Sequence, residues 1–315
     1  MPAVYTEDAI AQLIEKEGLP PSYRAVVDAH ILPLAQKVHA WWQEVDRPLI
    51  LGLHGAQGTG KSTIALFLKT LLTDNLDCRC VNFSLDDLYL TRAEREGLAE
   101  QVHPLLRTRG VPGTHDLLLG DRVIESLLFA TPDHTTSIPV FDKAADDRMP
   151  KHEWPVFQGK PDVILIEGWC LGAQPERDAD KLAEPINSLE EWADKDNTWR
   201  VYVNDQLWDA YAWFFDQIDR MIMLKAPSME SVIRWRTLQE HKLAERTGDA
   251  LKEGDSVSRV MSDREVLRFI MHYERVTRRC LYELPRRADV VFHIDEAHQI
   301  VKHKWKEQEA GDWLR

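Results

Sequence analysis

Short apolar runs recur along the chain, separated by segments in which apolar residues repeat at helical spacing. Residues 48–54 read PLILGLH and residues 162–166 read DVILI, and such nearly continuous apolar runs are typical of strands buried on both faces. Strands are predicted at 48–54, 79–84, 137–141, 162–166, 220–224 and 288–294. Because these runs alternate with helical segments, the pattern predicts an α/β fold in which helices cover both faces of a parallel sheet.

The helical segments divide the chain into a short extension and a main domain. Residues 1–45 read as a helical N-terminal extension, and residues 46–315 form the main domain. Further helices are predicted at 61–72, 116–129, 207–215, 228–246 and 262–284. Asp116, Ser228 and Ser262 are suited to cap three of these helices.

Two segments of the main domain show no periodicity. Residues 169–200 are polar and rich in Asp, Glu and Pro, so we expect an irregular insertion there. Residues 247–261 contain two glycines and a mixture of charges, which predicts a loop.

One motif carries a clear chemical meaning. The segment GAQGTGKS at 55–62 matches the phosphate-binding pattern G-x-x-x-x-G-K-[ST] between a predicted strand and a predicted helix. Its glycines allow a tight turn that presents backbone N–H groups to phosphate oxygens, and the helix adds its positive end. Lys61 would reach the β- and γ-phosphates of ATP, and the Ser62 hydroxyl would bind Mg²⁺. The predicted nucleotide-binding residues are Gly55, Ala56, Gln57, Gly58, Thr59, Gly60, Lys61, Ser62 and Thr63.

The charge balance limits the partners. The chain has 39 Lys and Arg against 52 Asp and Glu, a formal net charge of −13, which argues against general nucleic-acid or anionic-membrane binding. A nucleotide must then be held by local N–H groups and cations. No apolar run has the length of a membrane span, the four cysteines lack disulfide or zinc spacing, and the acidic start does not resemble a leader peptide. We expect a cytoplasmic protein, and its oligomeric state does not follow from the sequence.

Carboxylates that follow the predicted strands at 79–84 and 162–166 favour a kinase over other nucleotide-binding proteins. The chain lacks the N-K-x-D tetrapeptide of GTPases, and the strand at 162–166 ends in one carboxylate, Glu167, rather than the Asp-Glu pair of remodelling ATPases. Asp86 and Asp87 follow the strand at 79–84, which we expect to neighbour the strand of the phosphate loop. A carboxylate there could accept the proton of an attacking hydroxyl or cap the next helix. Glu167 could hold Mg²⁺ through water or merely end its strand.

Seven segments in order resemble one family. They are GAQGTGKST (55–63), FSLDDLYLT (83–91), RGVPGTHDL (109–117), PVFDKAADDR (139–148), ILIEGW (164–169), WRTLQEHKL (235–243) and MSDREVLRFI (261–270). Over about residues 45–295 the chain resembles the D-glycerate 3-kinases of plant and fungal type, within the P-loop kinases that include uridine kinase, phosphoribulokinase and pantothenate kinase. The resemblance implies a three-layer P-loop fold with a helical lid at about 228–262. It also implies phosphorylation of the 3-hydroxyl of D-glycerate by ATP.

The resemblance assigns catalytic roles by position. Asp86 corresponds to the catalytic base, and Lys61 belongs to the phosphate loop. Arg236 on the lid helix would neutralise charge on the transferred phosphoryl group, and its alternative is a salt bridge with Glu240, four residues on. Arg234 is two positions from Arg236 on the same helix, so the two side chains cannot both face the nucleotide.

A hydroxy acid also needs a partner for its carboxylate, either a cation or N–H donors. The loop at 106–116 and the segment at 141–148 carry suitable side chains. The predicted acceptor-binding residues are Asp86, Tyr89, Arg109, His115, Lys143 and Arg148. The alternatives are salt bridges among neighbours for the charged residues, a cap or turn for the histidine and core packing for the tyrosine.

The sequence therefore predicts an ATP- and Mg²⁺-dependent kinase of a small hydroxylated metabolite, with D-glycerate as the leading acceptor. A kinase of another metabolite, such as a nucleoside or pantothenate, is the first alternative. A non-catalytic ATP-binding protein is the second.

Overall fold

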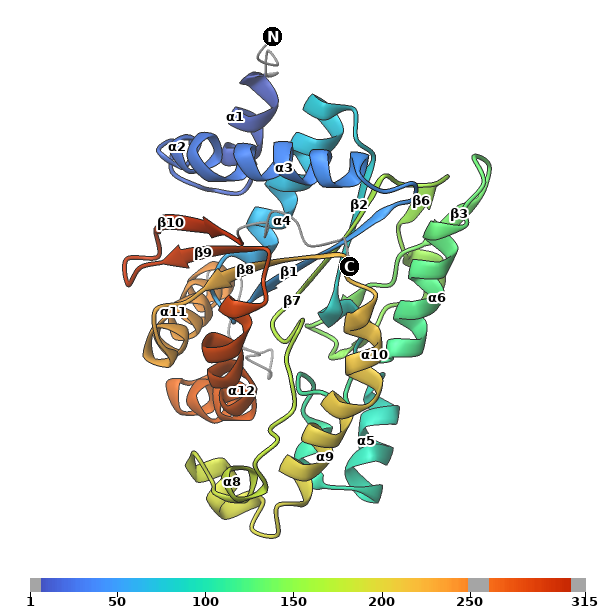
Figure 1. Ribbon diagram of the computed structural model, residues 1–315. Helices are drawn as coiled ribbons and strands as arrows, with labels where there is room; N and C mark the ends of the chain where they lie inside the picture. The colour runs from blue at the N-terminus through green and yellow to red at the C-terminus, as the bar shows by residue number, and fades with distance from the viewer. Residues whose placement is uncertain (1–6, 249–260, 307–315) are drawn as a thin grey trace, which may run out of the picture.

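A computed structural model describes residues 7–248 and 261–306. A six-stranded sheet in the order β10-β9-β8-β1-β7-β2 forms its centre (Figure 1). Its strands are β1 (Leu49–Gly55), β2 (Cys80–Ser84), β7 (Val163–Gly168), β8 (Arg220–Lys225), β9 (Val290–Ile294) and β10 (Ile300–Trp305). All are parallel except β10, which pairs antiparallel with β9. The predicted α/β fold with a mainly parallel sheet is confirmed.

Two sequence-based expectations about the strands are wrong. The strand β2 does not neighbour β1, because β7 lies between them. The run at 137–141 forms no strand of the main sheet. Pro139 interrupts it, and its ends belong to two small antiparallel pairs. These pairs are β3 (Thr135–Ser137) with β6 (Val156–Gln158), and β4 (Phe141–Asp142) with β5 (Asp147–Arg148).

Helices cover both faces of the sheet (Figure 1). They are α1 (Glu7–Lys16), α2 (Tyr23–Val26), α3 (Leu32–Gln43), α4 (Lys61–Thr70), α5 (Arg92–Gln101), α6 (Leu117–Leu128), α7 (Ala179–Ala183), α8 (Ser188–Ala193), α9 (Thr198–Trp208), α10 (Ala210–Asp216), α11 (Met229–Gly248) and α12 (Asp263–Glu283). The predicted caps are present, since side chains of Asp116, Ser228 and Ser262 each accept a backbone N–H. The helix predicted at 207–215 is divided between α9 and α10. The loop predicted at 247–261 lies outside the described residues except at its two ends.

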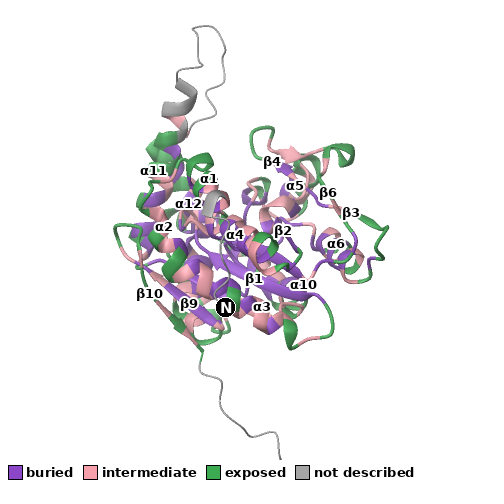
Figure 2. Cartoon of the chain, turned by 90° about the horizontal axis from the view of Figure 1, so that it is seen from above, coloured by how far each residue is buried: buried purple, intermediate pink, exposed green. Residues whose placement is uncertain are grey.

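Alternate residues of β1 face two hydrophobic cores. Leu49, Leu51 and Leu53 belong to a core shared with α1, α3, α4 and α11, whereas Ile50 belongs to one shared with α6, α9 and α10. Figure 2 shows β1 buried along its length. The N-terminal helices are part of the first core, to which they contribute Ile10 and other buried side chains. Among the described helices, none is both long and apolar enough to cross a membrane.

A buried charge network ties the segment 169–200 to α12. This segment was expected to be irregular, but it contains α7 and α8. Arg200 donates from Nε to Asp194 at 2.9 Å, and its guanidinium lies 3.6 Å from Glu190. Arg275 of α12 donates to the same Glu190 at 2.6 Å. Arg200, Asp194 and Glu190 are all buried, so each charge depends on the others for compensation.

Three buried, neutral histidines should make the folded protein less stable in acid. Burial lowers the pKa values of His54, His115 and His272 to about 4, against about 6.5 when unfolded. Below pH 6.5 the unfolded chain binds more protons, so stability is complete above that pH and is lost as the pH falls towards 4. His54 Nδ1 contacts the Leu171 carbonyl at 3.0 Å, a bond that asparagine could replace. In urea unfolding between pH 6 and 5, we expect His54→Asn to reduce the pH slope by about 1.2 kcal/mol per unit; an unchanged slope would contradict this.

Candidate active site

Three strand ends meet at one edge of the sheet. Gly55 ends β1 and begins the phosphate loop, and Glu167 lies near the end of β7 beside Leu53 of β1. Ser84, the last residue of β2, pairs with Glu167 from the other side. Because the strands are parallel, their carboxyl ends place the loop, Glu167 and the Asp86 turn at a single edge, where α/β proteins bind ligands.

The phosphate loop has the conformation that its glycines permit. Gly58 and Gly60 have φ angles of +77° and +84°, a region that residues with a side chain seldom adopt. The Thr59 hydroxyl donates to the Ala56 carbonyl at 2.8 Å and closes the turn. The helix α4 begins at Lys61. This strand–loop–helix arrangement is the context that the motif requires for phosphate binding.

The side chains of Lys61, Ser62 and Glu167 converge next to this loop. Ser62 Oγ donates to Glu167 Oε1 at 2.9 Å, and Lys61 Nζ lies 3.8 Å from Glu167 Oε2. That second oxygen is buried and has no hydrogen-bond partner among the described residues. A hydroxyl beside an unsatisfied carboxylate oxygen suits Mg²⁺, which binds few protein oxygens and completes its shell with water and phosphate. The described residues contain no group of three or more metal-binding His, Cys, Asp or Glu side chains.

Asp86 lies in the short turn Leu85–Leu88 after β2 and has two side-chain donors. Tyr89 donates its hydroxyl to Oδ1, and Lys143 donates from Nζ to Oδ2, both at 2.8 Å. Burial opposes the charge of this carboxylate, but Lys143 and Lys61 outweigh burial and hold the pKa of Asp86 below its usual range. Asp86 is therefore an ionised carboxylate near the phosphate loop.

Asp87 has a different environment from its neighbour. It accepts backbone N–H bonds from Ser84 at 3.1 Å and from Phe141 at 3.2 Å. Burial raises the pKa of Asp87 to about 6, despite these bonds. Its contacts are those of a cap that joins the turn to β4, the structural alternative that the sequence left open.

An aromatic stack lies behind Asp86. The buried rings of Tyr89 and His115 are stacked with centroids 4.6 Å apart. His115 Nδ1 contacts the Tyr211 hydroxyl, which also accepts the Gly113 N–H at 2.9 Å. His115 Nε2 is buried without a hydrogen-bond partner among the described residues. Tyr211 was not identified from the sequence, because only the fold brings α10 to this loop.

The basic acceptor candidates make different contacts. Arg109 forms a salt bridge with Asp146 and lies over the Phe141 ring, 5.4 Å from its centroid. The buried Arg95 also binds Asp146, at 3.0 Å. Lys143, by contrast, is 60% exposed and has Asp86 as its salt-bridge partner. Lys143 is thus the most accessible cation of this group, whereas Arg109 helps to hold the turn between β4 and β5.

Arg148 of β5 binds two oxygen atoms next to the aromatic stack. Its guanidinium donates to the Tyr89 carbonyl at 2.8 Å and to Asp116 at 3.3 Å. Its Nε is buried without a partner among the described residues. The contacts of Arg148 position Tyr89, which in turn donates to Asp86.

The helix α11 runs past the phosphate loop. A Cβ atom on Gly58 would lie 2.8 Å from Trp235 Cβ and 3.4 Å from the Arg236 N atom. The Arg236 side chain binds Glu240 at 2.6 Å, the salt bridge weighed as its alternative. Arg234 instead lies 3.5 Å from Glu296. The ring of His298, in the turn between β9 and β10, lies 4.6 Å from that of Trp235; nothing in the sequence links His298 to the loop.

This close approach makes Gly58 a sensitive position. In Gly58→Ala the new Cβ meets the α11 backbone at a positive φ, so we expect a cost of about 1–3 kcal/mol and weaker ATP binding in calorimetry. Gly97→Ala in α5 is the matched control, because a Cβ there meets nothing within 4 Å and alanine favours a helix. Unchanged ATP affinity and stability in Gly58→Ala would contradict this geometry.

Comparisons with known proteins show that the chain is similar to kinases. The uncharacterized kinase mug58 of Schizosaccharomyces pombe is 36% identical over 234 residues, which cover 72% of this chain and 79% of that protein. The chloroplastic D-glycerate 3-kinase of Arabidopsis thaliana is 32% identical over 240 residues, and the match spans only 46% of that enzyme. No family model matches the chain.

The fold is similar to that of a kinase of known structure. The D-glycerate 3-kinase of Cryptococcus neoformans superposes with a TM-score of 0.67 at 25% identity, covering 87% of this chain and 99% of the other. Sequence and fold therefore lead to one conclusion: the chain belongs to the family of P-loop kinases that includes mug58 and is related to D-glycerate 3-kinase.

Proposed function

We propose that this kinase transfers the γ-phosphate of ATP to the 3-hydroxyl of D-glycerate, which gives 3-phosphoglycerate and ADP. The observation that carries the proposal is the Asp86–Lys143 pair, 2.8 Å apart and at the same sheet edge as the phosphate loop. It offers a base for a hydroxyl and a cation for a carboxylate, the two groups of a hydroxy acid. The two relatives named D-glycerate 3-kinase support this acceptor.

The donor side would use the phosphate loop. Backbone N–H groups of residues 55–63 and Lys61 would hold the β- and γ-phosphates. Ser62 and Glu167 would hold Mg²⁺, which when bound supplies positive charge to the phosphate oxygens. The bond between the γ-phosphorus and ADP breaks as the bond to the acceptor oxygen forms, and Asp86 takes the hydroxyl proton.

When the acceptor binds, Lys143 would exchange its partner Asp86 for the carboxylate of the acceptor. A bound carboxylate would compete with Asp86 for the exposed Lys143 ammonium group and so release Asp86 towards the hydroxyl. Tyr89, held by Arg148, would keep Asp86 oriented, because its hydroxyl already donates to Oδ1. Arg109 and the unpartnered His115 Nε2 would border the acceptor.

The lid side depends on Arg236. We propose that Arg236 leaves Glu240 when ATP binds and neutralises charge on the transferred phosphoryl group. Its backbone already lies next to Gly58, so a change of side-chain rotamer would suffice to bring the guanidinium towards the loop.

The test is ADP release from Mg²⁺-ATP with a panel of acceptors. The panel contains D-glycerate, L-glycerate, pantothenate, uridine, ribulose 5-phosphate and a control without acceptor. We expect strong release with D-glycerate and background release with the rest. Release only with another acceptor would refute D-glycerate as the substrate. ATP binding without acceptor-dependent release would refute phosphoryl transfer to any acceptor in the panel.

A further inference from the structure

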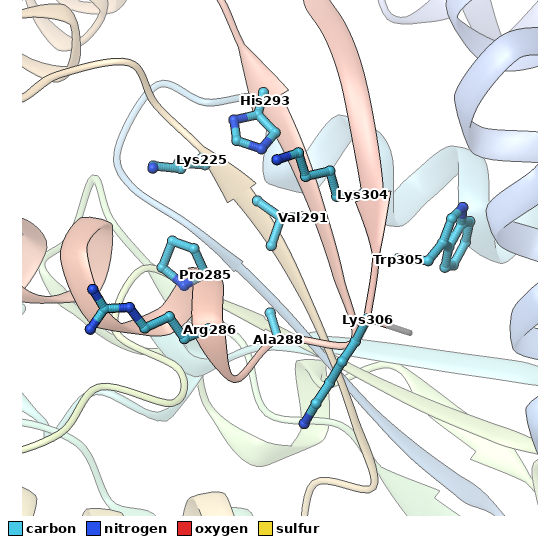
Figure 3. Close-up of a pocket in the computed structure, with 9 residues that line it drawn as sticks. All are labelled: Lys225, Pro285, Arg286, Ala288, Val291, His293, Lys304, Trp305 and Lys306. Atoms are coloured by element: carbon cyan, nitrogen blue, oxygen red, sulfur yellow. The ribbon is translucent and has the colours of Figure 1, made fainter. Parts of the chain in front are cut away.

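A cavity of about 340 Å³ lies between β8, β9, β10 and the turn Leu284–Arg286 (Figure 3). Five basic side chains line it: Lys225, Arg286, His293, Lys304 and Lys306. Figure 3 shows the Lys304 side chain extending towards the His293 ring, with Arg286 and Lys306 nearer the other end. The cavity takes no part in the proposed phosphoryl transfer.

In the part of the chain that the structure describes, residues 7–248 and 261–306, no carboxylate forms a salt bridge with Lys225, Arg286, Lys304 or Lys306. Burial lowers the pKa of His293, and the charges of Lys302, Lys225 and Lys304 lower it further. Like charges gathered in this way repel one another, and they do so in a chain whose net charge is −13.

The protection of the edge strand β10 against pairing with other chains explains only some of these basic residues. Lysines on an edge strand discourage pairing with other chains, and Lys304 and Lys306 lie on or directly after the edge strand β10. Lys225 and His293, however, belong to the interior strands β8 and β9, where they are register partners. Arg286 comes from a separate turn. Side chains from four segments thus converge on one cavity.

We propose that this cavity binds a small anion that carries at least two phosphate groups, or a phosphate and a carboxylate. Lys and Arg are suited to phosphate oxygens, and the volume lies within the range of small-molecule sites. Pro285, Ala288 and Val291 add an apolar wall for the carbon atoms of the ligand. A nucleoside diphosphate and a phosphorylated hydroxy acid share this chemistry.

The site is connected to the phosphate loop by two strands that line it. Beyond Lys225, β8 leads into α11, where Trp235 contacts Gly58. Beyond His293, β9 leads to the turn of His298, whose ring packs on Trp235. An anion that shifts either strand end would therefore change nucleotide affinity, and by reciprocity ATP would change the affinity of the anion.

The first test measures pyrophosphate binding by calorimetry, with the phosphate loop saturated by a non-hydrolysable ATP analogue and Mg²⁺. We expect the double variant Lys225→Gln/Lys304→Gln to bind pyrophosphate at least tenfold more weakly than wild type. The control Lys16→Gln/Lys160→Gln removes the same charge from exposed positions and should change affinity less than twofold. No binding to wild type, or equal losses in both double variants, would overturn the site.

The second test locates the anion by NMR titration of the His293 imidazole. A bound anion favours the charged ring, so pyrophosphate should raise the pKa of His293 in wild type; an unchanged pKa would overturn the proposed location. Titrations with ADP and with 3-phosphoglycerate, with the phosphate loop again saturated by the ATP analogue, identify which of these two ligands the cavity binds more tightly. A change of less than twofold in the affinity for the ATP analogue at saturating pyrophosphate would overturn the coupling between the sites.

Discussion

Replacing Asp86 by asparagine is expected to lower kcat by at least about 100-fold, the contribution typical of a general base. Asparagine keeps the shape of the side chain and can still accept the Tyr89 hydroxyl bond, but it cannot take a proton. ATP binding should persist, because the phosphate loop and Lys61 are unchanged. Steady-state kinetics with D-glycerate and calorimetry with ATP measure the two effects separately.

The adjacent carboxylate provides the matched control. Asp87→Asn makes the same chemical change one residue away, where the side chain accepts the N–H groups of Ser84 and Phe141. We expect it to lower the free energy of unfolding while keeping kcat within about tenfold of wild type, since a neutral acceptor oxygen can retain one such bond. Full turnover in Asp86→Asn, or equal losses of kcat in both variants, would show that Asp86 is not the base.

Replacing Arg200 by methionine is expected to lower the free energy of unfolding by about 3–5 kcal/mol. The change removes the cation between Asp194 and Glu190, which are fully buried. Both carboxylates would then lack their main compensation, although Arg275 would still bind Glu190. Urea unfolding at neutral pH measures the loss.

An exposed salt bridge on α11 is the control for Arg200. Arg234 is 55% exposed and lies 3.5 Å from Glu296, which is 76% exposed. Arg234→Met makes the same chemical change but should cost less than about 1 kcal/mol, since exposed pairs contribute little. A loss below about 1 kcal/mol in Arg200→Met would mean that water or a rearranged side chain compensates the buried carboxylates.

Local patterns predicted the elements that carry the site. The run before Gly55, the glycine spacing and the helix from Lys61 all depend on neighbouring residues, so the phosphate loop followed directly from the sequence. The N-caps at Asp116, Ser228 and Ser262 are local in the same way. Asp86 was identified because it follows a strand immediately, and the fold indeed brings that strand end to the loop's edge of the sheet.

Features that depend on distant residues could not be predicted. The position of β7 between β1 and β2 is a property of the whole sheet, and the sequence order of the strands does not reveal it. The contact of His298 with Trp235 joins segments more than 60 residues apart, and Tyr211 reaches His115 over a separation of 96 residues. The salt bridge of Arg109 with Asp146 also joins segments that are 37 residues apart.

The identity of the phosphorylated product decides whether the protein phosphorylates D-glycerate at its 3-hydroxyl. The protein is incubated with D-glycerate, Mg²⁺ and ATP labelled at the γ-phosphate, and the labelled product is identified by NMR. We predict label on the 3-oxygen of D-glycerate in stoichiometric amounts with ADP, formed at least about 100-fold more slowly by Asp86→Asn, which still binds ATP. Label released only as inorganic phosphate, or found on another oxygen, would show that the protein is not a D-glycerate 3-kinase.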